Sequence, residues 1–582
     1  MRVILWLAAV LCIAAAIACL FASNISFTSA RAIVVSAVPP GYEDRFTPGL
    51  YRKMVLGLRL LGAGLPVVAL GLVFVSKPLA RLLDSAFRSV TVTVVEIGDE
   101  IPRTRDGLVH LSACAAVFIW AVWLRLFFFQ EPVRKDEAYS YLYYASRPLF
   151  VGLTYYTANN HLLNTFLMHC STSLFGLSLW SVRLPTVIAG ILLLPATYIA
   201  VRLYHGKNAA LLASALIAAS SPLIEYSFNA RGYGFGALFM ILMVLMIGMA
   251  TVRASNGGWI LLPVMAALAL YSVPTMVYGV AGAFLYLLLS RSAWRRTLIA
   301  MTATGALSVL FYAPVFATVG LSAMTNNKWT AAVPRNLWWP LFQKEIGSLW
   351  KYWNMDVPPF IVFLIVWGFL LNLASRKAVR LPPWALFALI VVVACVLVPI
   401  QGIVPPRRVW LFLLPLWLSS AGAGGMILIR ASKHEDRATA ILALIVSFWM
   451  GANVLNAKSL RHSGIESVGG RSSEAIVLAV KDRLAHGAQF ICSDFFDSPL
   501  DFEMTLHHIP YAPSPLGDLL IVTPKGKSPA RTLELASIPE NEVIGIHQIG
   551  SYEDEDVYAA KRGPGLPFVP RGTTEMGAFT HQ

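Results

Sequence analysis

Charged residues are scarce in this sequence, and acidic ones are the scarcest. Asp, Glu, Lys and Arg make up 13% of the 582 residues, 57% are hydrophobic, and only 15 acids precede residue 457. Soluble domains carry about 25% charged residues, so a chain built only of such domains is excluded. The composition indicates a polytopic membrane protein. Because a carboxylate near a bilayer is costly, each of the few acids can be weighed singly.

Cysteine is also rare, and metal-binding patterns are missing from the sequence. No C-x-x-C pair or His/Cys ligand spacing occurs, which excludes a disulfide scaffold and a zinc-finger module. Four of the six cysteines fall inside expected membrane spans, so only Cys170 and Cys492 are left to form a disulfide. Despite a net charge of +15, nothing in the chain resembles a nucleic-acid-binding module.

Long apolar runs are what the sequence has in abundance. A helix needs roughly 17 to 25 apolar residues to cross a bilayer core of about 30 Å. We expect about thirteen transmembrane helices, the first of them a retained signal anchor. They lie near residues 3–22, 54–76, 108–129, 184–203, 209–225, 232–252, 258–272, 276–290, 297–318, 359–375, 382–399, 409–430 and 437–456.

Lys and Arg gather in alternate loops, which predicts the orientation. With the N-terminus inside, the inner segments are basic: 77–107, 204–207, 291–296, 375–380 and 430–437. The outer face then receives 23–53, the long loop 130–183, a short turn near 226–231, the loop 319–358, the turn 400–408 and everything after about 457. The chain is therefore expected to be an integral protein of the inner (cell) membrane.

Three domains are expected along the chain. Residues 1–107 form an N-terminal extension with two transmembrane helices, and 108–456 form the membrane core with its long first outer loop. Residues 457–582 carry 11 basic against 16 acidic residues. This segment has strand-like runs at 488–492 and 518–522 and a helical run at 474–484, so we expect a small extracytoplasmic α/β domain with a mobile tail.

One acid pair stands out in the stretch RKDEAYSYL, directly after a membrane span. Asp136 and Glu137 are the only adjacent acids that lie both next to a span and inside the long loop. Such a pair can supply a general base with a supporting carboxylate, or bind a cation. The alternative is structural: Asp136 caps a helix, Glu137 occupies its first turn, and Arg134 and Lys135 neutralise both. The other outward acids are Glu43, Asp44, Glu131, Glu225, Glu345 and Asp356.

Arginines on the same expected face suit an anion. Arg231 lies in a short turn, where Gly232 would let a phosphate approach the backbone. The alternative for Arg231 is an arginine that extends to lipid headgroups. Arg407 and Arg408 are unexpected outside, which favours anion binding unless the local topology is wrong. Lys328 and Arg335 are weaker candidates. These stretches together suit a lipid-linked phosphate that reacts at the membrane surface.

The order of motifs resembles the GT-C superfamily of membrane glycosyltransferases, in the branch of protein O-mannosyltransferases and of aminoarabinose transferases that modify lipid A. The resemblance lies in DEAYSY, NNHLLNTFLMHCSTSLFG, the segment from SVRLPTVIAG to SPLIEYSFNARGYGF, and PPRRVWLFLLPLWL. It covers roughly residues 108–430, so the first two spans and the C-terminal segment lie outside it.

The resemblance implies transfer of a sugar from a polyprenyl-phosphate donor to an acceptor hydroxyl on the extracytoplasmic side, with inversion. Asp136 would be the general base and Glu137 its support. The donor phosphate would be bound by Arg231, Tyr233, Arg407 and Arg408, where negative charge grows. The sugar or the acceptor would be contacted by Asn160, His161 and Glu225, although relatives often have His-Pro-Pro where this chain has Asn-Asn-His.

The remaining expectations concern cofactors, partners and a rival function. No cofactor is certain, and a divalent metal, which some relatives use, is left open. The partners are the lipid-linked donor, membrane lipid, and a glycan, lipid or protein acceptor. The rival is a transporter or flippase of lipid-linked sugars. Because the expected spans are nearly free of ionisable residues and the polar groups crowd one surface, the enzyme is favoured over the carrier.

Overall fold

A computed structural model describes most of the chain. The described residues are 1–38, 46–290, 293–320, 332–374, 383–430, 433–457, 459–462, 471–492, 497–536, 538–553, 555–563 and 566. Of the residues discussed above, Glu43, Asp44 and Lys328 lie outside this part, as does most of the polar C-terminal tail.

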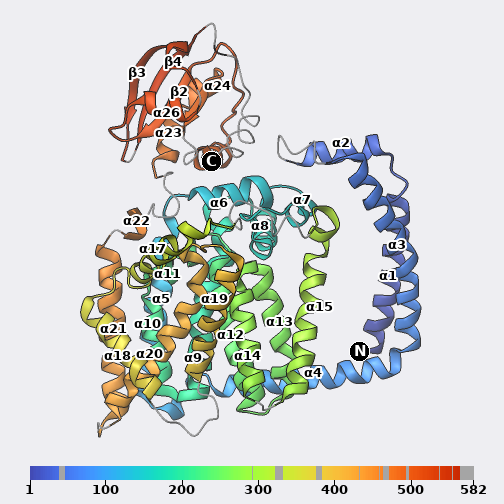
Figure 1. Ribbon diagram of the computed structural model, residues 1–582, viewed down its shortest axis with the longest axis vertical. Helices are drawn as coiled ribbons and strands as arrows, with labels where there is room; N and C mark the ends of the chain where they lie inside the picture. The colour runs from blue at the N-terminus through green and yellow to red at the C-terminus, as the bar shows by residue number, and fades with distance from the viewer. Residues whose placement is uncertain are drawn as a thin grey trace.

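The N-terminal extension stands beside the main helix bundle. α1 (Arg2–Ala22) and α3 (Pro48–Phe74) pack along each other, with the short α2 (Phe27–Ala37) between them in the chain. Thr47 begins α3 by accepting the Leu50 N–H at 3.2 Å. α4 (Ser76–Asp99) then runs crosswise at one end of the molecule and leads to the bundle (Figure 1). α4 is amphipathic, which suits a helix along a membrane surface.

Each of the thirteen expected spans coincides with an apolar helix. By length and composition, eight described helices are able to cross a membrane alone, and a bent helix pair adds a ninth. Four shorter apolar helices account for the rest. The helices of the bundle are α5 (Leu108–Phe127), α9 (Leu179–His205), α10 (Lys207–Ala218), α11 (Ser221–Phe228), α12 (Tyr233–Thr251), α13 (Asn256–Ser272), α14 (Val277–Leu289), α15 (Trp294–Thr318), α18 (Pro359–Ala374), α19 (Pro383–Gln401), α20 (Leu414–Ile429) and α21 (Glu435–Asn456).

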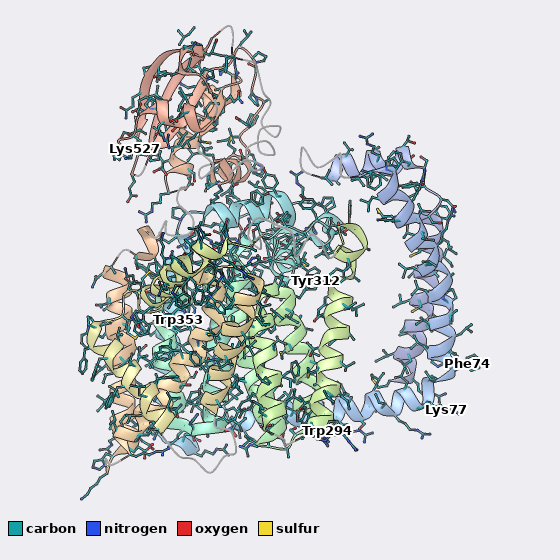
Figure 2. The ribbon with its side chains drawn as sticks, viewed as in Figure 1. Phe74, Lys77, Trp294, Tyr312, Trp353 and Lys527 are labelled. Atoms are coloured by element: carbon teal, nitrogen blue, oxygen red, sulfur yellow. The ribbon has the colours of Figure 1, made fainter. Side chains whose placement is uncertain are left out.

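The bundle has two chemically different ends. One end, here called the loop face, carries α6 (Lys135–Ser140), a π-helical segment (Tyr141–Ala145), α7 (Leu149–Thr154) and α8 (Leu162–Phe175) (Figure 1). Two further segments, α17 (Arg335–Trp353) and η6 (Arg407–Leu413), pack together there. Tyr312 and Trp353 lie toward this end, whereas Lys77 and Trp294 lie at the opposite one (Figure 2).

The opposite end holds an ion-pair network. Arg202 donates from both of its terminal nitrogens to Asp106, at 2.8 and 2.9 Å. Glu100 bridges Arg202, at 3.2 Å, and Arg253. These contacts join the α4–α5 connection to α9 and to the α12–α13 connection. They stabilise the end of the bundle away from the loop face.

The C-terminal segment folds into a small α/β domain beyond the loop face (Figure 1). Its sheet has the order β1-β2-β4-β3, with β1 (Gln489–Cys492) parallel to β2 (Leu519–Pro524) and the other neighbours antiparallel. The expected helix at 474–484 is split at Val480 into α23 (Ser473–Ala479) and α24 (Lys481–Ala485). The remaining elements are α22 (Ser459–His462), α25 (Asp497–Leu506), α26 (Pro529–Leu535), β3 (Val543–Ser551) and β4 (Glu555–Arg562).

The expected fold class is confirmed: a polytopic α-helical membrane protein with a small C-terminal α/β domain. The expected runs at 488–492 and 518–522 are β1 and β2. Cys170 and Cys492, the pair left open for a disulfide, are not joined by one. The domain limits at residues 107 and 456 stay predictions.

Candidate functional site

The acid pair lies at the start of α6, and this placement tests whether Asp136 is a helix cap. The helix begins at Lys135, so Arg134 occupies the N-cap position and Asp136 does not. Asp136 keeps 28% of its side chain exposed, and Arg231, not Arg134, is its ion-pair partner, with Nη1 at 3.4 Å from Oδ2. The helix-cap alternative for Asp136 is therefore wrong. Its carboxylate remains open to an incoming ligand.

Glu137 is placed very differently from its neighbour. It is wholly buried and accepts two hydrogen bonds from Arg183 of α9, each at 2.7 Å. The same guanidinium donates to the carbonyls of Phe129 at 2.7 Å and Glu131 at 2.6 Å. Glu137 also accepts from the Ala230 N–H at 3.3 Å. This pair therefore fixes the start of the long loop to α9 and to the Arg231 turn; the role of Glu137 as support for Asp136 stays a prediction.

Arg231 lies in the turn between α11 and α12 and is only 3% exposed. Besides Asp136, it donates to the side-chain oxygen of Asn159 and faces the Tyr233 ring at 5.9 Å. Its burial excludes the alternative of an arginine that extends to lipid headgroups. The turn needs a glycine next to it, because a Cβ on Gly232 would lie 2.3 Å from the Ser272 carbonyl oxygen.

His161 meets the same turn, and its hydrogen bonds determine its tautomer. The Gly232 N–H donates to Nδ1 at 2.7 Å, so Nδ1 carries no proton. Burial, and then the charges of Arg231 and Arg408, lower the pKa of His161 well below its usual value. The ring is therefore neutral, with its proton on Nε2.

This tautomer leaves two donors facing each other. Nε2 of His161 lies 3.4 Å from Nη2 of Arg231, and both atoms carry hydrogens. Neither can accept from the other, so an oxygen of an anion placed beside them would accept from both. The arrangement is suited to a phosphate.

Arg407 and Arg408, the other arginines predicted to bind phosphate, lie at the start of η6 near Arg231 and His161. Arg408 Nε donates to the Tyr233 hydroxyl at 3.2 Å. The Tyr233 ring in turn packs edge-on against His161 at 4.9 Å between ring centroids. Arg407 donates to the Ser348 hydroxyl at 3.2 Å and lies 5.2 Å from the Tyr352 ring centre. Arg408 thus joins the Arg231 group directly, while Arg407 contacts α17 beside it.

Two predicted ligand-contacting residues are engaged in holding the fold. Asn160 is 1% exposed and donates to the carbonyls of Gly152 at 2.8 Å and Tyr155 at 2.6 Å, while Thr165 donates to its oxygen at 2.7 Å. Glu225 is buried, pairs with Arg134, and accepts from the Tyr352 hydroxyl at 2.9 Å. Their contact with sugar or acceptor stays a prediction.

The acids near Asp136 do not fit a metal ion. A divalent cation takes several carboxylate or carbonyl oxygens. Glu137 and Glu225 already have arginine partners, and Asp136 lies beside the positive charge of Arg231. Within the described residues, no group of three metal-ligating side chains lies here. We therefore assign no step of the chemistry to a metal at this site.

Sequence reasoning missed three residues of this region. Arg183 lies in the segment SVRLPTVIAG, but the sequence alone assigns it no role. Asn159 directly precedes Asn160 and His161, which the sequence favours as ligand contacts instead. Arg125 lies inside α5, fully buried, and donates to the carbonyls of Ala121 at 3.0 Å and Ala218 at 3.1 Å. It meets the end of α10, where the chain bends by 64° before α11. The membrane spans therefore hold more buried charge than expected. The signal for this in the sequence is Arg125 itself, a charged residue inside an apolar run.

Comparison with known proteins gives a family match for part of the chain and a fold match for most of it. Residues 159–317 match the sequence family described as dolichyl-phosphate-mannose-protein mannosyltransferase. The apo crystal structure of ArnT from Cupriavidus metallidurans is similar over 78% of this chain and 98% of its own, at 14% identity and a TM-score of 0.52. The same protein bound to undecaprenyl phosphate is similar over 79% and 98%, at 12% identity and a TM-score of 0.51. No curated protein sequence matches the chain.

A more distant likeness is found to the apo oligosaccharyltransferase of Archaeoglobus fulgidus, over 80% of this chain and 76% of that one, at 13% identity and a TM-score of 0.42. The resemblance read from the motifs is confirmed by the matched family segment and by the fold of ArnT. The chain has the fold of the GT-C superfamily of membrane glycosyltransferases.

Proposed function

We propose that this protein transfers a sugar from a polyprenyl-phosphate donor to an acceptor hydroxyl, with Asp136 as the general base. One observation carries the proposal: a partly exposed carboxylate lies 3.4 Å from a buried arginine whose neighbouring histidine also offers a hydrogen-bond donor. An acid next to a site suited to phosphate is what transfer from a lipid phosphate requires.

The reaction follows from where the charges lie. Asp136 takes the proton of the acceptor hydroxyl as its oxygen forms a bond to the anomeric carbon of the sugar. The bond from that carbon to the phosphate oxygen breaks, and its electron pair stays on the leaving lipid phosphate. Arg231, the Nε2–H of His161 and Arg408 stabilise the growing negative charge. Attack opposite to the leaving group inverts the anomeric centre.

The donor is proposed from the family match and the fold. The matched family is described as using dolichyl phosphate mannose, and ArnT has been crystallised with undecaprenyl phosphate. Both are polyprenyl phosphates, so we propose this class of lipid carrier for the present chain, with a hexose or pentose as the sugar. The acceptor is a glycan, a lipid or a protein.

The loop face is proposed to be extracytoplasmic, in the inner (cell) membrane. Lys and Arg favour cytoplasmic loops. The basic segments 77–107 and 204–207 lie at the end opposite the loop face, where Arg202 and Arg253 form their network. By this bias, the acid pair and the C-terminal domain lie outside the cytoplasm.

A transfer assay with purified protein tests the function. The full chain in lipid nanodiscs is given radiolabelled polyprenyl-phosphate mannose or aminoarabinose together with lipid, glycan and peptide acceptors. We expect labelled acceptor from the wild type and from Glu345→Gln, which changes another acid of the loop face. We expect about 10² to 10⁴-fold less from Asp136→Asn, the usual loss for a general base.

If the protein is a carrier, the opposite result is expected. A transporter or flippase would move labelled donor across a proteoliposome membrane and leave the acceptor unlabelled. Movement of donor that is insensitive to Asp136→Asn, with no transfer to any acceptor, would contradict the proposed enzyme.

A further inference from the structure

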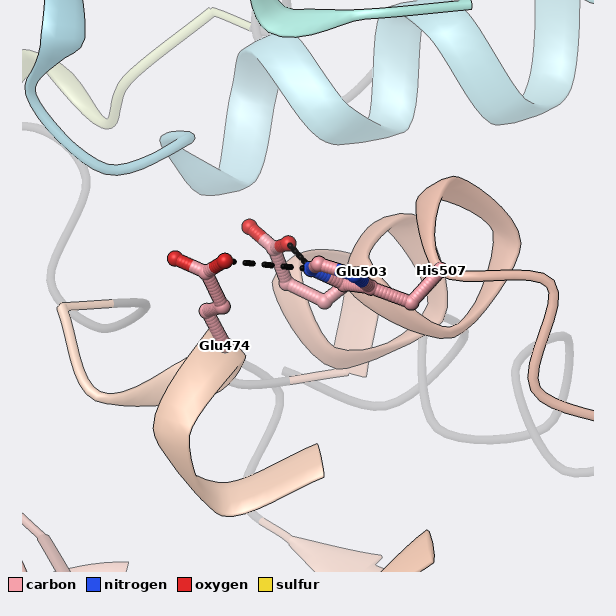
Figure 3. Close-up of side chains that lie close together, drawn as sticks. All are labelled: Glu474, Glu503 and His507. Carbon is pink, nitrogen blue, oxygen red and sulfur yellow. Dashed lines mark hydrogen bonds and ion pairs between the residues drawn. The ribbon is translucent and has the colours of Figure 1, made fainter. Parts of the chain in front are cut away.

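A cluster of possible metal ligands lies in the C-terminal domain, apart from the Asp136 site. Glu474 is in the first turn of α23, Glu503 is in α25, and His507 directly follows α25. Glu503 and His507 are four residues apart, so they share one side of the helix. Figure 3 shows the three side chains pointing toward one another from the two helices. Within the part of the chain that the structure describes, this is the one group of three such side chains.

The distances within the cluster suit a small divalent ion. Nε2 of His507 lies 3.1 Å from Oε1 of Glu474 and 3.7 Å from Oε2 of Glu503, and all three ligand atoms are within 4.8 Å of one another. Tetrahedral zinc, with ligand bonds of about 2.0–2.2 Å, separates its ligand atoms by roughly 3.3–3.6 Å. The ion therefore needs only small side-chain movements to bind all three.

Glu503 is the observation that points to a missing positive charge. Its side chain is 7% exposed, and its Oε2 atom, which faces the cluster, has no hydrogen-bond partner among the described residues. A buried carboxylate oxygen without a partner costs free energy. A cation at this place would remove that cost.

We propose that Glu474, Glu503 and His507 bind one divalent transition-metal ion of the zinc type, with water in the fourth position. Two carboxylates and one imidazole are ligands that zinc accepts, and three protein ligands leave one site to solvent. Glu474 is 61% exposed, which gives the ion a route of entry. The alternative is a contact of His507 with both carboxylates and no metal.

The position of this site gives the ion a structural task. α25 packs against α6, the helix that carries Asp136. Phe502, next to Glu503, is fully buried in a cluster with Ala138 and Tyr141, and its ring centre lies 5.7 Å from that of Tyr141. An ion that ties α23 to α25 would therefore hold the domain in place over the acid-bearing segment. It would act by positioning and not in the transfer itself.

Metal binding to the purified full chain tests the proposal without an activity assay. The protein is stripped with a chelator, passed into metal-free buffer and titrated with Zn²⁺ by calorimetry. We expect one ion per chain for the wild type and for His547→Gln, a histidine on β3 of the same domain. We expect at least about tenfold weaker binding for Glu503→Gln and for His507→Gln, since loss of a ligand weakens a metal site by at least as much as loss of its supporting residues.

Glu474→Gln keeps the test valid if the buried variants fold poorly. Its exposed side chain leaves the domain core intact, and we expect the same weakening of Zn²⁺ binding. An increase in the melting temperature of wild type on adding Zn²⁺, lost in Glu474→Gln, would accompany binding. No saturable Zn²⁺ site in the wild type, or wild-type affinity in all three variants, would overturn the proposal.

Discussion

At the scale of single residues, two neighbouring acids have separate environments. Asp136 is partly exposed beside Arg231, whereas Glu137 is wholly buried against Arg183. The side chains of adjacent helical residues point about 100° apart, so one can face a ligand while the other faces the core. In the proposed reaction, Asp136 takes the proton and Glu137 holds the helix in position.

Replacing Glu137 by Gln is expected to destabilise the loop face. The change leaves the buried Arg183 guanidinium without its charge partner, and breaking such a pair costs about 3–5 kcal/mol. Thermal unfolding in detergent measures the change. A matched change at the exposed ion pair of Arg531 and Glu534, Glu534→Gln, should shift the melting temperature little. Equal melting temperatures for wild type and Glu137→Gln would contradict the described pairing.

His161 predicts a pH dependence of stability. Its pKa is well below the ordinary value of about 6.5 because of burial and the charges of Arg231 and Arg408. Below about pH 6.5 the unfolded chain binds a proton that the folded chain does not, so this residue makes stability fall as the pH falls. We expect the melting temperature of wild type to drop between pH 7 and 5, and less so for His161→Gln. A larger drop in the variant would show that His161 is charged in the fold.

At the scale of elements, the turn between α11 and α12 brings the site together. It places Arg231 beside Asp136, and its Gly232 N–H orients His161. A Cβ at Gly232 would lie 2.3 Å from the Ser272 carbonyl and 2.6 Å from His161 Nδ1. At position 232, the turn therefore lies too close to the end of α13 and to the long loop for any residue with a side chain.

Gly232→Ala is therefore expected to lower both stability and activity. Overpacking at such a contact costs about 1–3 kcal/mol, and the displaced His161 would weaken donor binding. Gly305→Ala is the control, because a Cβ there meets nothing within 4 Å. Thermal unfolding and the KM for the donor check the pair. Unchanged values for Gly232→Ala would show that this close approach is not needed.

The sequence predicted the elements far better than their contacts. The apolar runs located thirteen apolar helices or bent helix pairs among the described residues, eight of them long enough to cross a membrane alone, because hydropathy is a strong local signal. Hydropathy says nothing about partners, so the pairing of Glu137 with Arg183 and of Glu225 with Arg134 was not predicted. The β3–β4 hairpin was missed because β3 is mostly exposed and interrupted by bulges, which blur an alternating pattern. Asp136 and Arg231 stood out in the sequence because charge is so rare here, and the structure places the two side chains side by side; their roles stay predictions.

At the scale of the whole molecule, the C-terminal domain contacts the segment that carries the acid. Phe502 of α25 is fully buried among residues of the long loop, next to Tyr141. In the N-terminal extension, by contrast, α1, α2 and α3 stand to the side of the bundle (Figure 1). The C-terminal domain is therefore in a position to affect how well ordered the loop face is.

Phe502→Ala is expected to loosen this contact. Removing a buried phenylalanine costs about 3–5 kcal/mol, here at the boundary between the domain and the long loop. We expect faster proteolysis of the C-terminal domain and reduced transfer. Leu516→Ala, at a position 92% exposed, should leave both unchanged. Wild-type proteolysis and transfer in Phe502→Ala would show that the domain is not coupled to the site.

In the proposed function, Asp136 acts as the base in sugar transfer and does not simply help to bind the donor. Single-turnover transfer at saturating labelled donor separates these two roles, for wild type and Asp136→Asn, with donor affinity measured on the same samples. If Asp136 is the base, we expect a rate about 10² to 10⁴-fold lower in the variant, with donor affinity retained. Transfer at the wild-type rate in Asp136→Asn would contradict this role.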